Sequence, residues 1–164
     1  MRFKIIIFFL FAISLSVCAQ EGRIPGDNVL RFYRLAIPVT RSAYEEDLGS
    51  DYNNVLTFWR ECEDYVNNLY VPLGFCFDVI EDDRLVLHES GLIDENIYNA
   101  PSLGTELLNE LIPSSAYDIG MWVTHRDDFE ENSGLSIENG AYLTSTKASG
   151  YAKTDKWVVA HEIG

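Results

Sequence analysis

Positive charges, cysteines and long apolar runs are all scarce in this chain of 164 residues. It has 12 Lys and Arg against 26 Asp and Glu, a formal net charge of −14. Phosphate binding requires clustered cations, so this balance argues against nucleic acid as a partner. After residue 19 no apolar run is long enough to cross a bilayer, which predicts no stable membrane insertion of the mature chain. Internal repeats and low-complexity segments are also absent from the sequence.

The remaining composition is that of a folded protein. Hydrophobic residues make up 47% of the chain, which is ordinary for a globular domain and argues against wholesale disorder. The length suits one domain with a real core. The acidic balance favours solubility and carries no information about a substrate.

The first 19 residues are interpreted as a signal peptide. Arg2 and Lys4 form a short positive region, residues 5–17 are apolar, and the small residue Ala19 ends a plausible cleavage site. This predicts a signal peptide over 1–19, a flexible leader over 20–28 and the folded region over 29–164, in a secreted or periplasmic bacterial protein. Lipid attachment at Cys18 is the alternative processing route.

Two cysteines, Cys62 and Cys76, follow the signal peptide. An even pair in an oxidising compartment favours a disulfide. Cys62 lies in a predicted helix and Cys76 in the next predicted strand, so a bridge between the two elements is geometrically feasible. Two free thiols are the equal alternative.

Apolar spacing predicts alternating strands and helices. The spacing i, i+3, i+4, i+7 predicts a helix over 51–70, with Ser50 or Asp51 as its N-cap. A second helix is expected over 105–112 and a third from about residue 156, capped by Asp155. Strands are expected over 29–40, 75–80, 85–87, 117–124 and 140–143, with polar loops over 41–50 and 90–103. This order predicts a layered α/β or α+β sheet.

The most informative residues are His161 and Glu162 in the last predicted helix. A histidine there could hold Zn²⁺, and a glutamate beside it could take a proton from the attacking water. A His-Glu pair alone occurs by chance in many proteins. The apolar run Val158-Val159-Ala160 before it and Ile163-Gly164 after it strengthen the interpretation, because they reproduce the surroundings of an H-E-x-x-H helix.

On these residues the chain resembles the metzincin zinc endopeptidases, and most of all the reprolysin-type enzymes secreted by bacteria. The likeness includes VVAHEIG at 158–164, YDIG at 117–120, GAY at 140–142 and KASG at 147–150. The helix over 51–70 is similar to the first helix of that family. The family signature continues as H-x-x-G-x-x-H, so the resemblance implies a chain cut within its zinc motif.

The resemblance implies a twisted five-stranded sheet, mostly parallel with one antiparallel edge strand, two long helices and the start of the active-site helix. It implies Zn²⁺ as the cofactor, His161 as the first metal ligand and Glu162 as the catalytic base. The second ligand would fall at position 165 and the third six positions later. A peptide or protein substrate would bind along an edge strand containing Gly140, Ala141 and Tyr142.

Three hypotheses therefore remain at this point. The first is a secreted zinc-dependent endopeptidase, present as an N-terminal fragment that is inactive alone. The second is a non-catalytic secreted binding module with a degenerate metzincin-like fold. The third is an unrelated α/β domain with an accidental His-Glu pair. The first predicts a strand over 118–123 beside the last helix, with His161 facing the cleft side of the sheet. His125 is expected to be a surface histidine.

Overall fold

The computed structural model describes residues 29–125, 134–136 and 144–164 of the chain. The chain divides into two compact units, Met1–Leu30 and Arg31–Gly164, and every element below belongs to the second. Among the described residues, no helix combines the length and the apolar character needed to cross a membrane.

Five strands form one sheet in the order β2-β1-β3-β5-β4. They are β1 (Arg31–Ala36), β2 (Phe75–Val79), β3 (Ile119–Thr124), β4 (Gly134–Leu135) and β5 (Gly150–Lys153). The pairs β1–β2, β1–β3 and β3–β5 are parallel, and β4 pairs antiparallel with β5 at one edge. The predicted fold class, a layered α/β sheet that is mostly parallel with one antiparallel edge strand, is confirmed.

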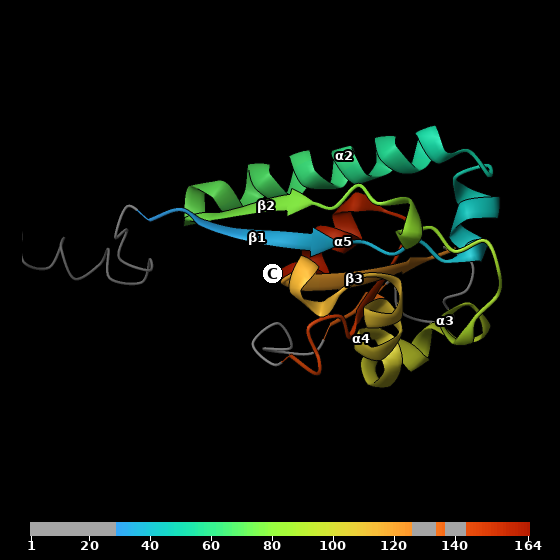
Figure 1. The fold of residues 1–164 in the computed structure, drawn as a ribbon. Coiled ribbons are helices and arrows are strands. Elements are labelled where there is room, and N and C mark those ends of the chain that lie inside the picture. The colour runs from blue at the N-terminus through green and yellow to red at the C-terminus, as the bar shows by residue number, and fades with distance from the viewer. Residues whose placement is uncertain (1–28, 126–133, 137–143) are drawn as a thin grey trace, which may run out of the picture. The chain divides into compact units, whose positions relative to one another are not determined.

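The long helix α2 (Tyr52–Tyr70) runs alongside β2 (Figure 1). Asp51 caps it by accepting a hydrogen bond from the backbone N–H of Asn53. After the 3-10 helix η2 (Val71–Leu73), Gly74 adopts the left-handed conformation with φ 90°, which lets the chain turn directly into β2. The predicted helix over 51–70 is confirmed, including its cap.

The buried face of α2 packs on the sheet. Its buried side chains are Val55, Phe58, Trp59, Cys62 and Val66. The indole of Trp59 is fully buried, and its Nε1 donates a hydrogen bond of 2.9 Å to the carbonyl of Ile37, just after β1. This bond satisfies the only polar atom of the Trp59 side chain, so it ties α2 to the end of β1 without leaving a buried donor unpaired.

Residues 90–103, expected as a loop, contain helical segments. They are α3 (Leu92–Glu95), the 3-10 helix η4 (Ile97–Asn99) and the start of α4 (Ala100–Leu111). The expected helix over 105–112 therefore begins five residues earlier, because Pro101 lies in its first turn, where a missing N–H costs nothing. Another 3-10 helix, η5 (Ser114–Ala116), connects α4 to β3.

Helix α4 covers the face of the sheet that carries Trp122. The Trp122 Nε1 donates to the Gly104 carbonyl at 3.1 Å. A Cβ on Gly104 would lie 2.3 Å from the carbonyl oxygen of Ala148, so only glycine permits this approach of helix to sheet. Because side chains alternate along a strand, Met121 and Val123 point to the opposite face, where α5 (Lys156–Ile163) packs.

Two further expectations are corrected by the structure. Residues 41–50, expected as a loop, contain the π-helix η1 (Ala43–Asp47). Residues 85–87, expected as a strand, instead begin with the last residue of the 3-10 helix η3 (Asp83–Leu85), and Val86 is its C-cap. Val86 forms only an isolated parallel bridge with Val39, which also bridges Val123. Pro38, next to Val39, has no N–H to continue the ladder of β1, so the expected strand over 29–40 ends at Ala36.

Candidate functional site

The helix α5 carries His161 and Glu162 along the margin of the sheet. Asp155 caps it as predicted, accepting from the Trp157 N–H at 2.8 Å. Val159 and Ala160 are buried against the core. The carbonyl of Ala160 accepts a hydrogen bond of 3.0 Å from the Tyr70 hydroxyl at the end of α2. The start and the end of α5 are thus both fixed, which holds His161 and Glu162 in a defined orientation.

Further contacts fix α5 against α2. Lys156 Nζ and Glu61 Oε2 are 2.8 Å apart. The rings of Trp157 and Tyr65 have centroids 5.0 Å apart, although 63% of the Trp157 surface stays exposed. Successive residues of a helix point about 100° apart. The side of α5 opposite Val159 therefore carries Trp157 and, one turn later, His161.

Glu162 lies beside the edge strand β4. A Cβ on Gly134 would be 2.9 Å from both Glu162 Cγ and Val158 Cγ1, so the absence of a side chain at Gly134 lets α5 approach the strand. The carboxylate is half-buried. The predicted catalytic base is therefore next to the antiparallel edge of the sheet.

A cavity of about 980 Å³ lies at the amino ends of the parallel strands. The last two residues of α5, Glu162 and Ile163, and its C-cap Gly164 form one wall. Aromatic rings form another large part of the lining, from Phe32, Tyr33, Tyr70, Phe75, Phe77 and Tyr117. The cavity thus has a mixed lining, in which aromatic rings alternate with polar groups that include Glu162, Asp118 and Lys147.

His161 is exposed and does not line this cavity. The prediction that it faces the cleft side of the sheet is wrong. The helical turn of about 100° between neighbours explains the difference, because directing Glu162 toward β4 directs His161 away from the sheet. The predicted strand over 118–123 is confirmed as β3, and it contacts α5.

One zinc ligand is available where three are needed. Among the described residues, no group of three or more His, Cys, Asp or Glu side chains could hold a metal ion. A catalytic zinc site uses three protein ligands. The exposed imidazole of His161 fits the role of one of them, and the described residues do not complete the set.

The predicted substrate-binding residues Gly140, Ala141 and Tyr142 lie outside the described residues. Within the described part, the antiparallel edge strand is β4, which comes earlier in the sequence than expected. Its residues, Gly134 and Leu135, pair with Ala152 and Tyr151 of β5.

Cys62 and Cys76 are free thiols in the structure. Cys62 points from α2 into the core. On β2, the buried neighbour Phe77 faces α2 through its edge-to-face contact with Tyr70, so Cys76 points to the opposite face of the sheet. The feasible bridge between the two elements is therefore not formed. Burial raises the pKa of the Cys62 thiol far above its ordinary value.

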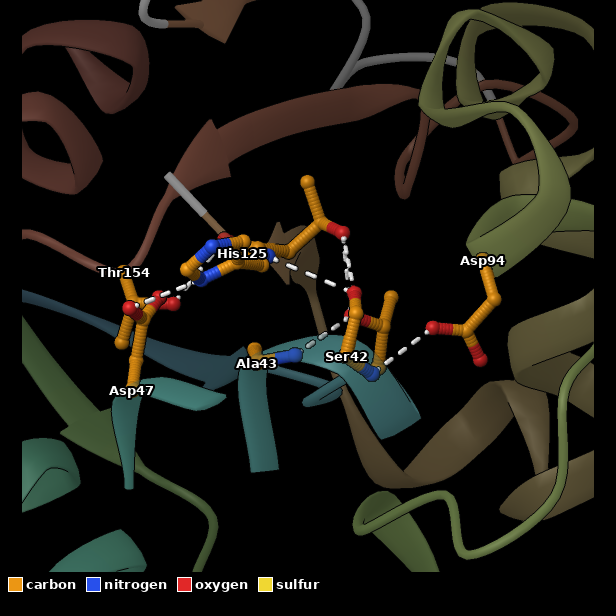
Figure 2. Close-up of polar contacts among 8 residues, drawn as sticks. Ser42, Ala43, Asp47, Asp94, His125 and Thr154 are labelled. Atoms are coloured by element: carbon orange, nitrogen blue, oxygen red, sulfur yellow. Dashed lines mark hydrogen bonds and ion pairs between the residues drawn. The ribbon is translucent and has the colours of Figure 1, made fainter. Parts of the chain in front are cut away.

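A polar cluster that sequence reasoning missed lies beyond the carboxyl ends of β1 and β3 (Figure 2). The hydroxyls of Thr40, Ser42 and Thr124 lie 3.0–3.2 Å from one another. His125 Nδ1 is 2.9 Å from Asp47 Oδ1, and their side chains are only 20% and 4% exposed. The expectation of a surface histidine is therefore wrong, because η1 brings Asp47 over the end of β3.

This cluster lies where ligands bind in many open α/β sheets, between strands whose connections leave in opposite directions. Its groups are nonetheless bonded to one another. Asp94 accepts from the backbone N–H groups of Arg41 at 3.1 Å and Ser42 at 3.0 Å. We interpret it as a structural polar network that joins η1, α3 and β3. The polar side chains of this cluster come from positions spread over about 85 residues. No local pattern in the sequence therefore indicates that they lie together.

Lys147 closes the opposite end of the sheet. Its side chain is buried, and its Nζ donates to the carbonyls of Ser114 and Tyr117 and lies 3.8 Å from the centroid of the Tyr117 ring. Burial lowers the pKa of Lys147, and the nearby Asp118 opposes that shift. Bonded in this way, the ammonium group fixes residues 146–149 against the start of β3.

No protein-family profile matches this chain, and no curated protein matches its sequence.

Proposed function

We propose that this chain is the N-terminal part of a secreted zinc-dependent endopeptidase and is inactive without the residues that complete its metal site. The proposal rests on one observation: α5 presents His161 and Glu162 on two adjacent faces, with Glu162 beside the antiparallel edge strand. An edge strand can bind an extended peptide by adding it to the sheet. A peptide so placed would pass close to the Glu162 carboxylate.

Each residue has a stated role in this proposal. Zinc, when bound, supplies Lewis-acid activation of water for attack on a peptide carbonyl. His161 contributes one imidazole ligand from the exposed face of α5. Glu162 accepts the proton of the attacking water and returns it to the leaving amine. The contacts of α5 with Tyr70 and Glu61 hold both side chains in place.

A non-catalytic secreted binding module is the second candidate. The observation that favours it is the orientation of His161, which is exposed and turned away from the cavity. In such a module the sheet and its edge would be kept for binding, and the His-Glu pair would have no catalytic role.

The coding sequence beyond codon 164 separates the two candidates. Continuation as H-x-x-G-x-x-H supports the peptidase, and an immediate stop codon supports the binding module. The continued protein should then cleave peptides in a zinc-dependent manner. Glu162→Gln should lower kcat by about 10²–10⁴-fold, as removal of a general base does. Glu106→Gln, on the exposed side of α4, is the matched control. Full activity in the Glu162→Gln protein would exclude the proposed mechanism.

A further inference from the structure

The outer edge of β2 is blocked by side chains of α2. In a parallel pair, alternate residues direct both backbone groups to the same neighbour. Gly74 accepts from the N–H of Arg31, and Ile80 donates to Leu35, so the even-numbered residues of this strand bond to β1. The backbone groups of Phe75, Phe77 and Val79 therefore point outward, where the described residues provide no further strand.

Asn67 takes the place of a partner strand. Its Nδ2 donates to the Phe77 carbonyl at 2.8 Å, and its Oδ1 accepts from the Phe77 N–H at 2.8 Å. One primary amide thus forms the same pair of bonds that a neighbouring strand would form. One turn earlier on α2, Glu63 Oε2 accepts from the Val79 N–H at 2.8 Å. Three outward backbone groups in the middle of β2 are satisfied in this way.

Without these bonds, β2 has the properties of a strand that pairs with other chains. Residues 75–80 (Phe-Cys-Phe-Asp-Val-Ile) contain one charge, two aromatic rings and two β-branched residues, and no proline. Natural edge strands carry devices that prevent such pairing, because an open row of N–H and C=O groups is a template for a second chain. Glu63 and Asn67, four residues apart on one face of α2, are spaced to reach Val79 and Phe77 of the strand.

We propose that Asn67 and Glu63 hold β2 as a closed edge, and that opening it creates a self-association surface whose partner is β2 of a second copy of this chain. A two-fold axis perpendicular to the sheet makes the interface isologous and pairs the two copies of β2 antiparallel. The register that bonds every outward group places Phe77 opposite Phe77 of the second copy, and Phe75 opposite Val79. Cys76 then lies opposite Asp78, on the face of the sheet away from α2.

Asn67→Leu tests the proposal, with Asn68→Leu as the control. Asn68 is the next residue on α2 and is exposed, so its substitution makes the same chemical change without opening the edge. Light scattering after gel filtration over a range of concentrations should show dimers of the Asn67→Leu protein. Half-dimerisation is expected at a concentration at least about tenfold lower than for the control, equivalent to about 1.4 kcal/mol. Equal behaviour of the two variants would refute the proposal.

The register supplies a second test that general aggregation of a weakened protein would not pass. In the Asn67→Leu background, Cys76→Glu places like charges opposite each other across the two copies, and Cys76→Lys places opposite charges there. Cys76→Glu should restore the monomer, and Cys76→Lys should strengthen the dimer. Association that ignores the sign of the charge at position 76 would overturn the proposed pairing.

A milder variant covers the case in which Asn67→Leu does not fold. Glu63→Ala frees only the Val79 N–H, and Asp64→Ala, at an exposed neighbour, is its control. A fluorescent peptide with the sequence of residues 74–80, with Cys76 replaced by Ala, serves as the probe. Anisotropy should show at least about threefold tighter binding to the Glu63→Ala protein. Equal binding to both proteins would contradict a closed edge.

Discussion

Arg34 and Asp118 form a bidentate ion pair between β1 and the start of β3. The guanidinium Nε lies 3.0 Å from Oδ2 of Asp118 and Nη2 lies 2.8 Å from Oδ1. The same carboxylate accepts from the backbone N–H of Arg34 at 2.8 Å, and Nη1 donates to the Ser115 carbonyl at 2.6 Å. The Asp118 carboxylate therefore links β1 to the start of β3, its parallel neighbour in the sheet.

This pair predicts a specific acid sensitivity. Hydrogen bonds from Arg34 lower the pKa of Asp118 below its ordinary value of 3.8. Because the folded pKa is the lower one, the stabilisation is complete above about pH 4 and is lost as the pH falls through the folded pKa. Asp118→Asn should reduce the free energy of unfolding at pH 6, and the difference from the wild type should shrink below pH 4.

Urea unfolding followed between pH 2.5 and 7 measures this effect. The side chains of Arg34 and Asp118 are 45% and 37% exposed, so solvent screens the pair and the effect should be modest. Asp64→Asn, at an exposed position of α2, is the control. A constant difference between Asp118→Asn and the wild type across this range would contradict the prediction.

Tyr117 predicts a loss of stability in alkaline solution. Burial raises the pKa of Tyr117 to about 12, and its hydroxyl donates to Asn109 Oδ1 at 2.9 Å. Between about pH 10 and 12 the unfolded phenol ionises and the folded one does not, so the free energy of unfolding falls, by about 2 kcal/mol in total. Tyr117→Phe should remove this part of the alkaline loss, at a cost of about 1 kcal/mol at pH 8. The part that comes from Cys62, whose pKa burial also raises, should remain.

Chemical unfolding at pH 8, 10 and 11 tests this prediction. Asn109→Ala is the control, because it removes the hydrogen-bond acceptor and keeps the phenol. It should lose stability at pH 8 and still lose more at pH 11. If Tyr117→Phe loses as much stability as the wild type between pH 8 and 11, then the alkaline sensitivity comes from other groups.

Gly104 predicts a strong steric effect. A methyl group there would approach the Ala148 carbonyl oxygen to 2.3 Å and Trp122 Nε1 to 2.9 Å. The first atom is backbone and cannot rotate away, so α4 must shift and the bond from Trp122 must lengthen. Gly104→Ala should destabilise the protein by about 3 kcal/mol, the upper end of the range for overpacking. Gly91→Ala, whose methyl group would meet nothing within 4 Å, should change stability by well under half of that amount.

The candidate metal site predicts a negative result for this chain alone. With one imidazole from α5, it should bind zinc weakly in a competition assay with a fluorescent chelator. His161→Ala should abolish most of that binding, and His88→Ala serves as the control. The chain should not cleave peptides, with or without zinc. Peptidase activity that Glu162→Ala abolishes would show that this chain already contains a complete centre.

The sequence predicted those helices and strands whose characteristic pattern lies within one short stretch of residues. The apolar spacing of α2 and its Asp51 cap lie within one stretch of sequence, as do Asp155 and the run that follows it in α5. The strand β3 is also continuous and apolar. The fold class followed from the order of these elements, because alternating strands and helices require a layered sheet.

Features that depend on distant residues were missed. In the sequence, His125 follows an apolar strand and precedes charged residues, which is typical of a surface position. Its partner Asp47 is brought to it by η1, from a distant part of the chain. The edge strand β4 contains two residues, Gly134 and Leu135, too few for a periodic pattern. The motif correctly identified α5 as a helix, but the direction of His161 depends on how α5 packs against β4.

The carboxylate of Asp94 accepts hydrogen bonds from the backbone N–H groups of Arg41 and Ser42, the two residues that lead into η1. These residues precede Asp94 by 53 and 52 positions in the sequence. Local bonds from the N–H groups of Ala43 and Tyr44 to Thr40 hold the next turn, so Asp94 adds a link from the start of this segment to α3. The amides of Arg41 and Ser42 are therefore bonded to α3 and not to a residue of their own segment. Amide exchange at Arg41 and Ser42 consequently reports the opening of α3, a segment to which neither residue belongs.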